Sequence, residues 1–386
     1  MTDINNVIYM DHAATTPVYP EVIQAMQPYM EEMYANPSAI YRPASRVAKD
    51  VSAARSLIAG CIGALPEEIY FTSGGSESDN WALFSVCEAR GFKDCHIITS
   101  QIEHHAVINT CKRLEKLGVK VTYLPVSGTG LVDPRKVTEN LCPETVMVSV
   151  MYANNETGTI EPVSEIGQLL REKKVLFHTD AVQALGHIPI DMNTLNADMM
   201  SASAHKLGGP KGVGMLYIRK GVPAYPFIHG GAQERGRRAG TVNVPGVIGF
   251  AEAMRISAEG LERNAEKIRS MRDRMISRIL TEIPDCVLNG DPDNRLPGNV
   301  NISFRGVEGE TLLILLDRAG ICASSGSACS TGAIDPSHVL TAMGLDEAAA
   351  RSAVRFTLSE HNTPDEVDRV TDTLKEIVER LRTACR

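Results

Sequence analysis

Closely spaced cysteines are missing from this sequence. Its 386 residues include nine cysteines, an odd number, and no two of them form a C-x-x-C pair. A disulfide framework or a structural zinc site needs paired or closely spaced thiols, so neither is expected here. Most of these cysteines are therefore expected to be small, buried, reduced residues, and no metal ligand set is predicted.

Blocks of positive charge and long apolar runs are missing as well. Lysine and arginine number 39 against 47 aspartates and glutamates, which gives a formal net charge of −8. An acidic chain without a basic block is a poor candidate for binding nucleic acid. No apolar run is long enough to span a bilayer, and residues 1–17 lack the basic and apolar regions of a secretory signal. We expect a cytoplasmic protein with no direct nucleic-acid or membrane partner.

Short apolar runs alternate with helix-length segments through the first two thirds of the chain. The runs predicted as buried strands are 67–73, 96–100, 121–126, 145–152, 175–180 and 212–218. Residues 76–90 and 163–174 between them have helical patterns. This alternation predicts an α/β fold with a mostly parallel sheet that is covered on both faces. Ligands of such sheets bind beyond the carboxyl ends of the strands, so residues that follow strands are candidates.

The pattern changes from about residue 250. A long charged helix is predicted over 248–281, followed by short strand-like and helical segments and a closing helix over 364–382. This change predicts a second, smaller α+β domain, and the chain length suits two domains of unequal size.

Three strand ends carry polar residues whose function is open from the local pattern alone. Gly75 and Ser76 begin a helix whose free amide groups suit a phosphate, but a plain capped helix needs the same residues. His104 follows another strand and is as well explained as a surface residue; no third ligand is spaced for a metal. Asn154 and Asn155 fit an ordinary turn equally well.

Asp180 and Lys206 follow later strands and point to a specific chemistry. A buried carboxylate is costly without a cation, and a protonated pyridine nitrogen would supply one, although Asp180 could simply cap the next helix. Lys206 follows Ser201, Ser203 and His205, as a Schiff-base lysine of pyridoxal phosphate would. Lys211 in the next glycine turn is the alternative. Asp180 and Lys206 together favour the cofactor over a surface lysine.

Cys329 lies in a run of small residues, ASSGSACSTG, over 323–332. Alone it would be a free thiol on a linker, but beside Lys206 and Asp180 it becomes a candidate nucleophile. Glycine and serine give such a loop the reach to deliver a thiol to more than one place.

The motifs together resemble one enzyme family over nearly the whole chain. The segments that carry the resemblance include YMDHAATTP (9–17), TSGGSESDN (72–80), ANNETGTI (153–160), HTDAVQALG (178–186), SAHKLGGPKGVG (203–214), ERGRRAGTVN (234–243) and SSGSACSTG (324–332). The chain resembles cysteine desulfurases of the NifS/IscS type, in the class V aminotransferase family of pyridoxal-phosphate enzymes.

The resemblance implies the aspartate-aminotransferase-like fold, fold type I. A large cofactor-binding domain over 16–250 would contain a mostly parallel seven-stranded sheet. A smaller α+β domain, made of 1–15 and 251–386, would carry a mobile catalytic-cysteine loop at about 322–333.

The resemblance also implies how pyridoxal 5′-phosphate is held. Lys206 would bind it covalently and later move the substrate Cα proton, and Asp180 would keep its ring nitrogen protonated. Gln183 would contact the ring hydroxyl, and His104 would stack on the ring and assist proton transfer. The remaining cofactor contacts would be Gly75, Ser76, Ser203, His205, Asn154 and, from the neighbouring subunit of a homodimer, Thr241.

For the substrate L-cysteine, the resemblance implies a carboxylate site at Arg355, helped by Asn154 and Asn36. The thiolate of Cys329 would take the sulfur as a persulfide, release alanine, and pass the sulfur to an acceptor. That acceptor would be an iron–sulfur scaffold protein or a thiolation system. A selenocysteine lyase, an aminotransferase and a non-catalytic cofactor-binding protein are the alternatives, but only a desulfurase has a use for Cys329.

Four positions depart from the family pattern. Tyr41 replaces a common histidine, Pro43–Ala44 replaces phenylalanine–glycine, and Ser76 replaces threonine. The changes at 41 and 43–44 could alter the entrance or the carboxylate contacts, whereas Ser76 keeps the hydroxyl.

Overall fold

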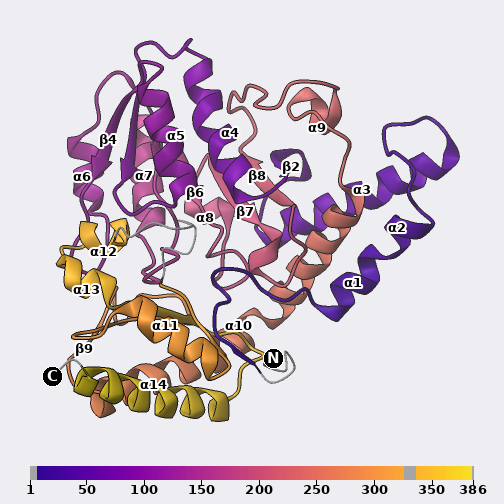
Figure 1. Ribbon diagram of the computed structural model, residues 1–386. Coiled ribbons are helices and arrows are strands. Elements are labelled where there is room, and N and C mark those ends of the chain that lie inside the picture. Colours follow the sequence, from indigo (N-terminus) through magenta and orange to yellow (C-terminus); the bar gives the residue numbers. More distant parts are fainter. Residues whose placement is uncertain (1–6, 326–335, 385–386) are drawn as a thin grey trace.

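A seven-stranded sheet forms the centre of the larger part of the molecule in the computed structural model, which describes residues 7–325 and 336–384 (Figure 1). Its strands are β2 (Ile69–Thr72), β3 (His96–Ser100), β4 (Lys120–Leu124), β5 (Thr145–Ser149), β6 (Leu176–Asp180), β7 (Met199–Ser203) and β8 (Gly214–Ile218). They lie in the order β2-β8-β7-β6-β5-β3-β4, and only β8 runs antiparallel to its neighbours. The predicted mostly parallel seven-stranded sheet is confirmed, and β7 is the strand that the sequence pattern missed.

Helices cover both faces of this sheet. They include α4 (Gly75–Glu88), α5 (His105–Glu115), α6 (Pro134–Glu139), α7 (Val163–Lys173) and α8 (Met192–Leu195). Successive side chains of a strand point to opposite faces, so Ile97 of β3 belongs to the same core cluster as Trp81 of α4, while Ile98 belongs to a different one. Burial on both faces explains why these strands have continuous apolar runs.

A second, antiparallel sheet has its own core. It contains β9 (Cys286–Leu288), β10 (Asn299–Phe304) and β12 (Ala353–Thr357), in the order β12-β10-β9. Its helices are α11 (Gly309–Arg318), α12 (His338–Ala342), α13 (Glu347–Arg351) and α14 (Pro364–Ala384). Phe304, Leu312, Phe356 and Leu374 are fully buried in this core.

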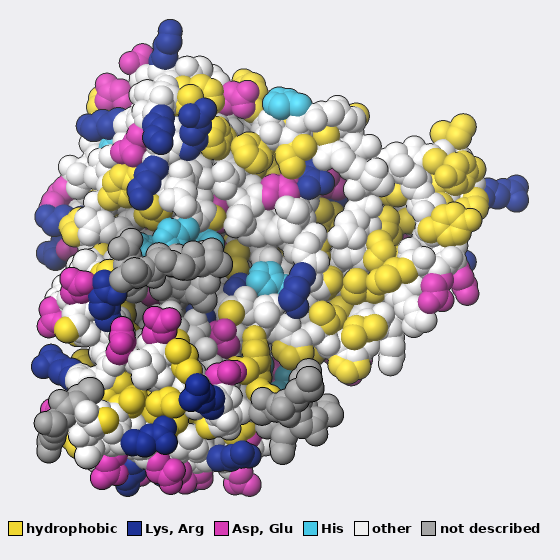
Figure 2. All heavy atoms as spheres, viewed as in Figure 1, with side chains coloured by type: hydrophobic (Ala, Val, Ile, Leu, Met, Phe, Trp, Pro, Cys, Tyr) yellow, Lys and Arg dark blue, Asp and Glu magenta, His cyan; other side chains and the backbone are white. Residues whose placement is uncertain are grey.

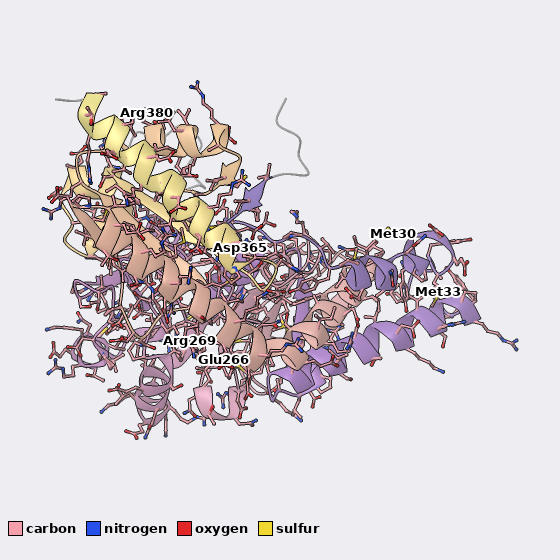
Figure 3. All side chains as sticks on the ribbon, turned by 90° about the horizontal axis from the view of Figure 1, so that it is seen from below. Met30, Met33, Glu266, Arg269, Asp365 and Arg380 are labelled. Atoms are coloured by element: carbon pink, nitrogen blue, oxygen red, sulfur yellow. The ribbon has the colours of Figure 1, made fainter. Side chains whose placement is uncertain are left out.

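One helix, α10 (Val244–Glu282), belongs to both parts. Val247 and Phe250 pack in the core beneath the large sheet, whereas Met271 and Ile279 pack in the core of the small sheet. The predicted domain boundary at residue 250 therefore falls inside a continuous helix. Figure 3 shows α14 lying along α10, with Asp365 in the first turn of α14 and Arg380 near its other end.

The N-terminal segment connects the two parts a second time. Strand β1 (Ile8–Tyr9) pairs in parallel with β11 (Ile321–Cys322), and Asp11 forms a bridge with Thr357. The chain then forms an arm of α1 (Pro20–Met26), α2 (Pro28–Glu31) and α3 (Arg42–Cys61), which extends to the right in Figure 1. The remaining helix is α9 (Gln233–Gly236), with short 3₁₀ turns η2 (Pro66–Glu68) and η3 (Ala204–Lys206). Within the described residues, no helix combines the length and apolarity needed to cross a membrane.

Candidate active site

A cavity of about 350 Å³ lies at the carboxyl ends of the central parallel strands, where the two parts of the molecule meet. The large sheet contributes residues that follow β5, β6 and β7, and α4 and α5 contribute the residues at their N-termini. The small sheet contributes Arg355 from β12. Of the residues predicted from the sequence, the cavity is lined by Gly75, Ser76, His104, Asp180, Gln183, Ser203, His205, Lys206 and Arg355.

Lys206 ends the 3₁₀ turn η3 that follows β7. Its Nζ donates hydrogen bonds to the carbonyl oxygens of Ala13 and Ala14, the latter at 2.8 Å. Both alanines also line the cavity. The N-terminal segment therefore holds the lysine amine at the cavity wall.

Asp180 is the last residue of β6 and is buried. Its Oδ1 accepts a hydrogen bond from the Val182 backbone N–H at 2.9 Å. Burial raises the pKa of Asp180 to about 6, against the opposing effects of that N–H and of Lys206. A carboxylate in this position gains stability from a cationic group in the cavity. Gln183 lies one residue beyond Val182 and donates from Nε2 to the Ala13 carbonyl at 3.0 Å.

The first turn of α4 forms an anion site. The leading N–H groups of a helix have no intrahelical acceptor and bind phosphate well. Gly75 and Ser76 stand there, with Ser203 and His205 opposite, and the same four residues line an adjoining cavity that also includes Lys211. A Cβ at position 75 would lie 2.6 Å from Val182 Cγ2, so any larger residue there would have to displace the Val182 side chain.

His104 is the N-cap of α5, and its Nδ1 accepts a hydrogen bond from the Ala106 N–H at 3.1 Å. Burial, together with the charge of Lys206, lowers the pKa of His104 to about 4. The imidazole is therefore neutral at physiological pH. Because Nδ1 accepts, its proton is on Nε2.

Arg355 brings a positive charge to the cavity from β12, although its side chain is only 3 % exposed. Its Nη2 lies 2.8 Å from Asp11 Oδ1, and its Nη1 donates to the Asn155 carbonyl at 2.9 Å. These two contacts fix the plane of the guanidinium group. A planar guanidinium suits a carboxylate by two parallel hydrogen bonds.

The structure corrects the role expected of Asn154. Its side chain is wholly buried and is used by the turn: Oδ1 accepts from the N–H groups of Glu156 and Thr157, and Nδ2 donates to the Ile102 carbonyl. Asn154 does not line the cavity, whereas Asn155 does. The candidate for a cofactor or substrate contact is therefore Asn155.

Asn36 and Thr241 lie outside the cavity of their own chain. Asn36 is exposed beyond α2, where its Oδ1 accepts from the Ser38 N–H in a local turn. Thr241 is exposed just before α10. Tyr41, one of the departures from the family pattern, is an exposed residue at the start of α3 and also lies away from the cavity.

Cys329 lies outside the described residues, which stop at 325 and resume at 336. Ser324 lies two residues before that gap and pairs with Arg355: the Ser324 N–H donates to the Arg355 carbonyl at 3.1 Å, and the Arg355 N–H donates to the Ser324 carbonyl at 2.6 Å. The chain thus enters the segment of Cys329 beside a residue that lines the cavity. Cys322 is half-buried in β11, and burial raises the pKa of its thiol.

Comparison with known proteins places this geometry in a family. Residues 8–370 match the family model described as aminotransferase class-V. A curated relative named cysteine desulfurase IscS, from Methanosarcina thermophila, is 50 % identical over 98 % of this chain and 93 % of its own length. The chain belongs to the class-V aminotransferase family.

Solved structures agree with this assignment. A NifS-like protein superposes with a TM-score of 0.91 at 39 % identity, covering 97 % of this chain and all of that one. A structure described as SspA in complex with cysteine has a TM-score of 0.81 at 36 % identity, covering 92 % of this chain and all of that one. The predicted fold type, the cysteine desulfurase class and the pyridoxal phosphate cofactor are confirmed for this member of the family.

The donor set of the cavity fits pyridoxal phosphate. The cavity joins an amine, a buried carboxylate and a helix N-terminus where a Cβ would clash, which match the aldehyde, ring nitrogen and phosphate of that cofactor. Sequence reasoning missed the parts played by Ala13, Ala14, Asp11 and Asn155. All four lie in the quoted motifs, but a motif does not say which of its atoms face the cavity.

Proposed function

We propose that the cavity around Lys206 binds pyridoxal 5′-phosphate and that it removes sulfur from L-cysteine to give L-alanine, with Cys329 as the sulfur acceptor. The observation that carries this assignment is the convergence of two sets of groups on one cavity. Lys206, Asp180 and the α4 N-terminus come from the large sheet, and Arg355 comes from the small sheet. The first set suits the cofactor, and the second suits the carboxylate of an amino acid.

When bound, the cofactor supplies an electron sink for negative charge at the substrate Cα. Lys206 would hold it covalently and then move the proton at that Cα, because its amine is kept at the cavity wall by the two alanine carbonyls. Asp180 would hold the proton on the ring nitrogen. Neutral His104 would offer its Nε2–H to the reacting groups. Ser203, Ser76 and the amide groups of α4 would hold the phosphate.

The sulfur step is balanced without an external oxidant. The Cys329 thiolate would attack the substrate sulfur, so that a sulfur–sulfur bond forms while the carbon–sulfur bond breaks. The carbon that loses sulfur takes up a proton and becomes the methyl group of alanine. The two sulfur atoms remain on Cys329 as a persulfide, and an iron–sulfur scaffold protein or another acceptor would then remove the outer sulfur.

A homodimer is the assembly that we propose. Large apolar side chains are exposed along α1–α3 at Ile23, Met30, Tyr34, Ile40 and Tyr41. Figure 2 shows apolar side chains gathered over this arm, and Figure 3 labels Met30 on it. Such a patch is typical of a protein–protein interface. A second copy would cover the arm, and its Thr241 would complete the phosphate site that the chain's own Thr241 does not reach.

The test measures alanine and sulfide released from L-cysteine in the presence of a thiol reductant, for the wild-type protein and for Cys329→Ser. Equal amounts of both products, lost in the variant, are expected. Selenocysteine cleavage that survives in Cys329→Ser at an undiminished rate, with no cysteine activity in the wild type, would favour a selenocysteine lyase. Conversion of an added keto acid to its amino acid would favour an aminotransferase. Light scattering of the purified protein tests the dimer.

A further inference from the structure

A second buried carboxyl group, that of Asp79, lines the same cavity as Asp180 and has no part in the mechanism above. Asp79 lies in α4, one turn beyond the phosphate site, and its side chain is 1 % exposed. One oxygen of Asp79, one oxygen of Asp180 and one ring nitrogen of His104 all lie within 4.8 Å of one another. Two buried carboxyl groups this close to each other interact strongly when they titrate.

The contacts of Asp79 do not provide a cation. The hydroxyl of Ser201 in β7 lowers the pKa of Asp79 but carries no charge, and Oδ1 of Asp79 has no hydrogen-bond partner among the residues described. His178 Nε2 lies 3.7 Å from Oδ1, too far for a hydrogen bond. Both His178 nitrogens already pair with hydroxyls, Nδ1 with Ser149 and Nε2 with Ser201, and burial lowers the pKa of His178 to about 3. His178 is therefore neutral.

The other titratable groups that face this pair do not change the balance. Glu103, from the loop after β3, is buried, and burial raises its pKa to about 8. His104 is neutral at pH 7 because its pKa is lowered to about 4. The positive charge of Lys206 lowers the pKa of Asp180, which favours the ionised form of that member of the pair. Burial and the nearby Asp180 raise the pKa of Asp79 well above its usual range, with Ser201 opposing them.

We propose that Asp79 is the protonated member of a carboxyl pair with Asp180, and that it is a positioning residue that leaves the pair with a single negative charge, on Asp180. This inference rests on the proposed function, because that charge is the one assigned to the cofactor ring nitrogen. Asp180 is the member that keeps the charge because its Oδ1 accepts the Val182 N–H. Oδ1 of Asp79 has no hydrogen-bond partner among the described residues, and a neutral acid costs less to bury in that way than a carboxylate does.

The position of Asp79 in α4 gives its proton a second effect. The same helix presents Gly75 and Ser76 to the phosphate one turn earlier. An ionised Asp79 would put a buried negative charge close to the site of a dianionic group, and the two charges would repel each other. A neutral Asp79 leaves the phosphate site at the start of α4 without a negative charge nearby in the same helix.

The first measurement is made without cofactor or substrate. Infrared difference spectra of the wild-type protein against Asp79→Asn at pH 7, in chelator, report whether a protonated carboxylic acid is lost with the substitution. We expect its C=O band to be present in the wild type and missing in the variant. An unchanged acid region, with loss of a carboxylate band instead, would overturn the proposal. Because no turnover is measured, this result does not depend on whether the protein acts on cysteine.

The second measurement is the dissociation constant of pyridoxal phosphate as a function of pH. Asp79→Asn imitates the protonated acid, so its dissociation constant for pyridoxal phosphate at pH 7 should lie within about threefold of the wild-type value. A change of one pKa unit would correspond to about tenfold. Asp180→Asn is the matched control and should bind at least about tenfold more weakly. Towards alkaline pH the dissociation constant of the wild type should change as Asp79 loses its proton, whereas that of Asp79→Asn should not change in this way. Weakening of Asp79→Asn to the level of Asp180→Asn would show that Asp79 is ionised and would refute the inference.

Discussion

Replacing Arg355 by alanine should raise the KM for L-cysteine while leaving the cofactor bound. Arg355 lines the cavity but belongs to β12, whereas the groups assigned to the cofactor come from the large sheet, α4 and α5. Loss of the guanidinium group should therefore remove the substrate carboxylate contact selectively. The absorption band of bound pyridoxal phosphate should be retained.

The size of the effect follows from the contact that is lost. A hydrogen-bonded contact to a charged group contributes about 1.5–3 kcal/mol. At about 1.4 kcal/mol for each factor of ten, this corresponds to a KM roughly 10- to 150-fold higher. The variant also leaves Asp11 without the partner that lies 2.8 Å away, so part of any change could come from local rearrangement.

Two further variants separate the carboxylate contact from this rearrangement. Arg355→Lys keeps a positive charge but loses the planar pair of donors, so its KM should lie between those of wild type and Arg355→Ala. Asp11→Asn with Arg355→Ala removes the unpaired charge and should restore stability but not KM. Steady-state alanine production measures kcat and KM, and thermal unfolding measures stability. An unchanged KM in cofactor-loaded Arg355→Ala would refute the assignment.

Three other changes test separate parts of the site. Lys206→Ala should lower alanine release by roughly 10²–10⁴-fold or more, the range of a lost proton-transfer group, and sustained turnover would contradict its role. Gly75→Ala should weaken cofactor binding because its Cβ would lie 2.6 Å from Val182 Cγ2, an overpacking of about 1–3 kcal/mol. Adding Val182→Ala removes that methyl group and should restore affinity; failure to do so would mean that the clash is not the cause. Glu103, whose pKa rises from 4.5 to about 8 on burial, stabilises the fold below pH 4.5 and loses that contribution as the pH rises through 8. Between pH 5 and pH 8, Glu103→Gln should therefore gain stability relative to the wild type. The gain should exceed about 1.4 kcal/mol, the value of one pKa unit. Stability curves that run parallel over this pH range would count against a protonated Glu103.

The sequence predicted the strands best where their residues are apolar on both faces. Strand β7 has the sequence MMSAS, and its serines do not look like buried strand residues. In the structure Ser201 Oγ pairs with His178 Nε2 on the neighbouring strand at 2.9 Å, so a polar contact inside the sheet replaces apolar packing. Such a contact joins residues of two strands and is not visible in the pattern of either one.

Some site residues could be predicted from the sequence and others could not, because the role of the latter depends on contacts between distant or neighbouring elements. Lys206 and Asp180 stand out because a lysine and a carboxylate at strand ends have few structural uses. Asn154 and Asn155 are adjacent and identical in type, and only the turn geometry decides that Asn154 is used by the backbone and Asn155 faces the cavity. Asp79 is the fifth residue of α4, and its burial beside Asp180 depends on how α4 packs on β6 and β7.

The N-terminal segment also affects when the protein can become active during its synthesis. Asp11 pairs with Arg355 across 344 residues of sequence, and Ala13 and Ala14 hold Lys206 from the same segment. At about 5–20 residues per second, a ribosome needs roughly 17–70 s to make that stretch. Throughout this time the first residues must wait without their partner strand, while the large sheet can already form. The large sheet can therefore be folded around Lys206 well before Arg355 has been made and can bind the carboxylate of an amino acid.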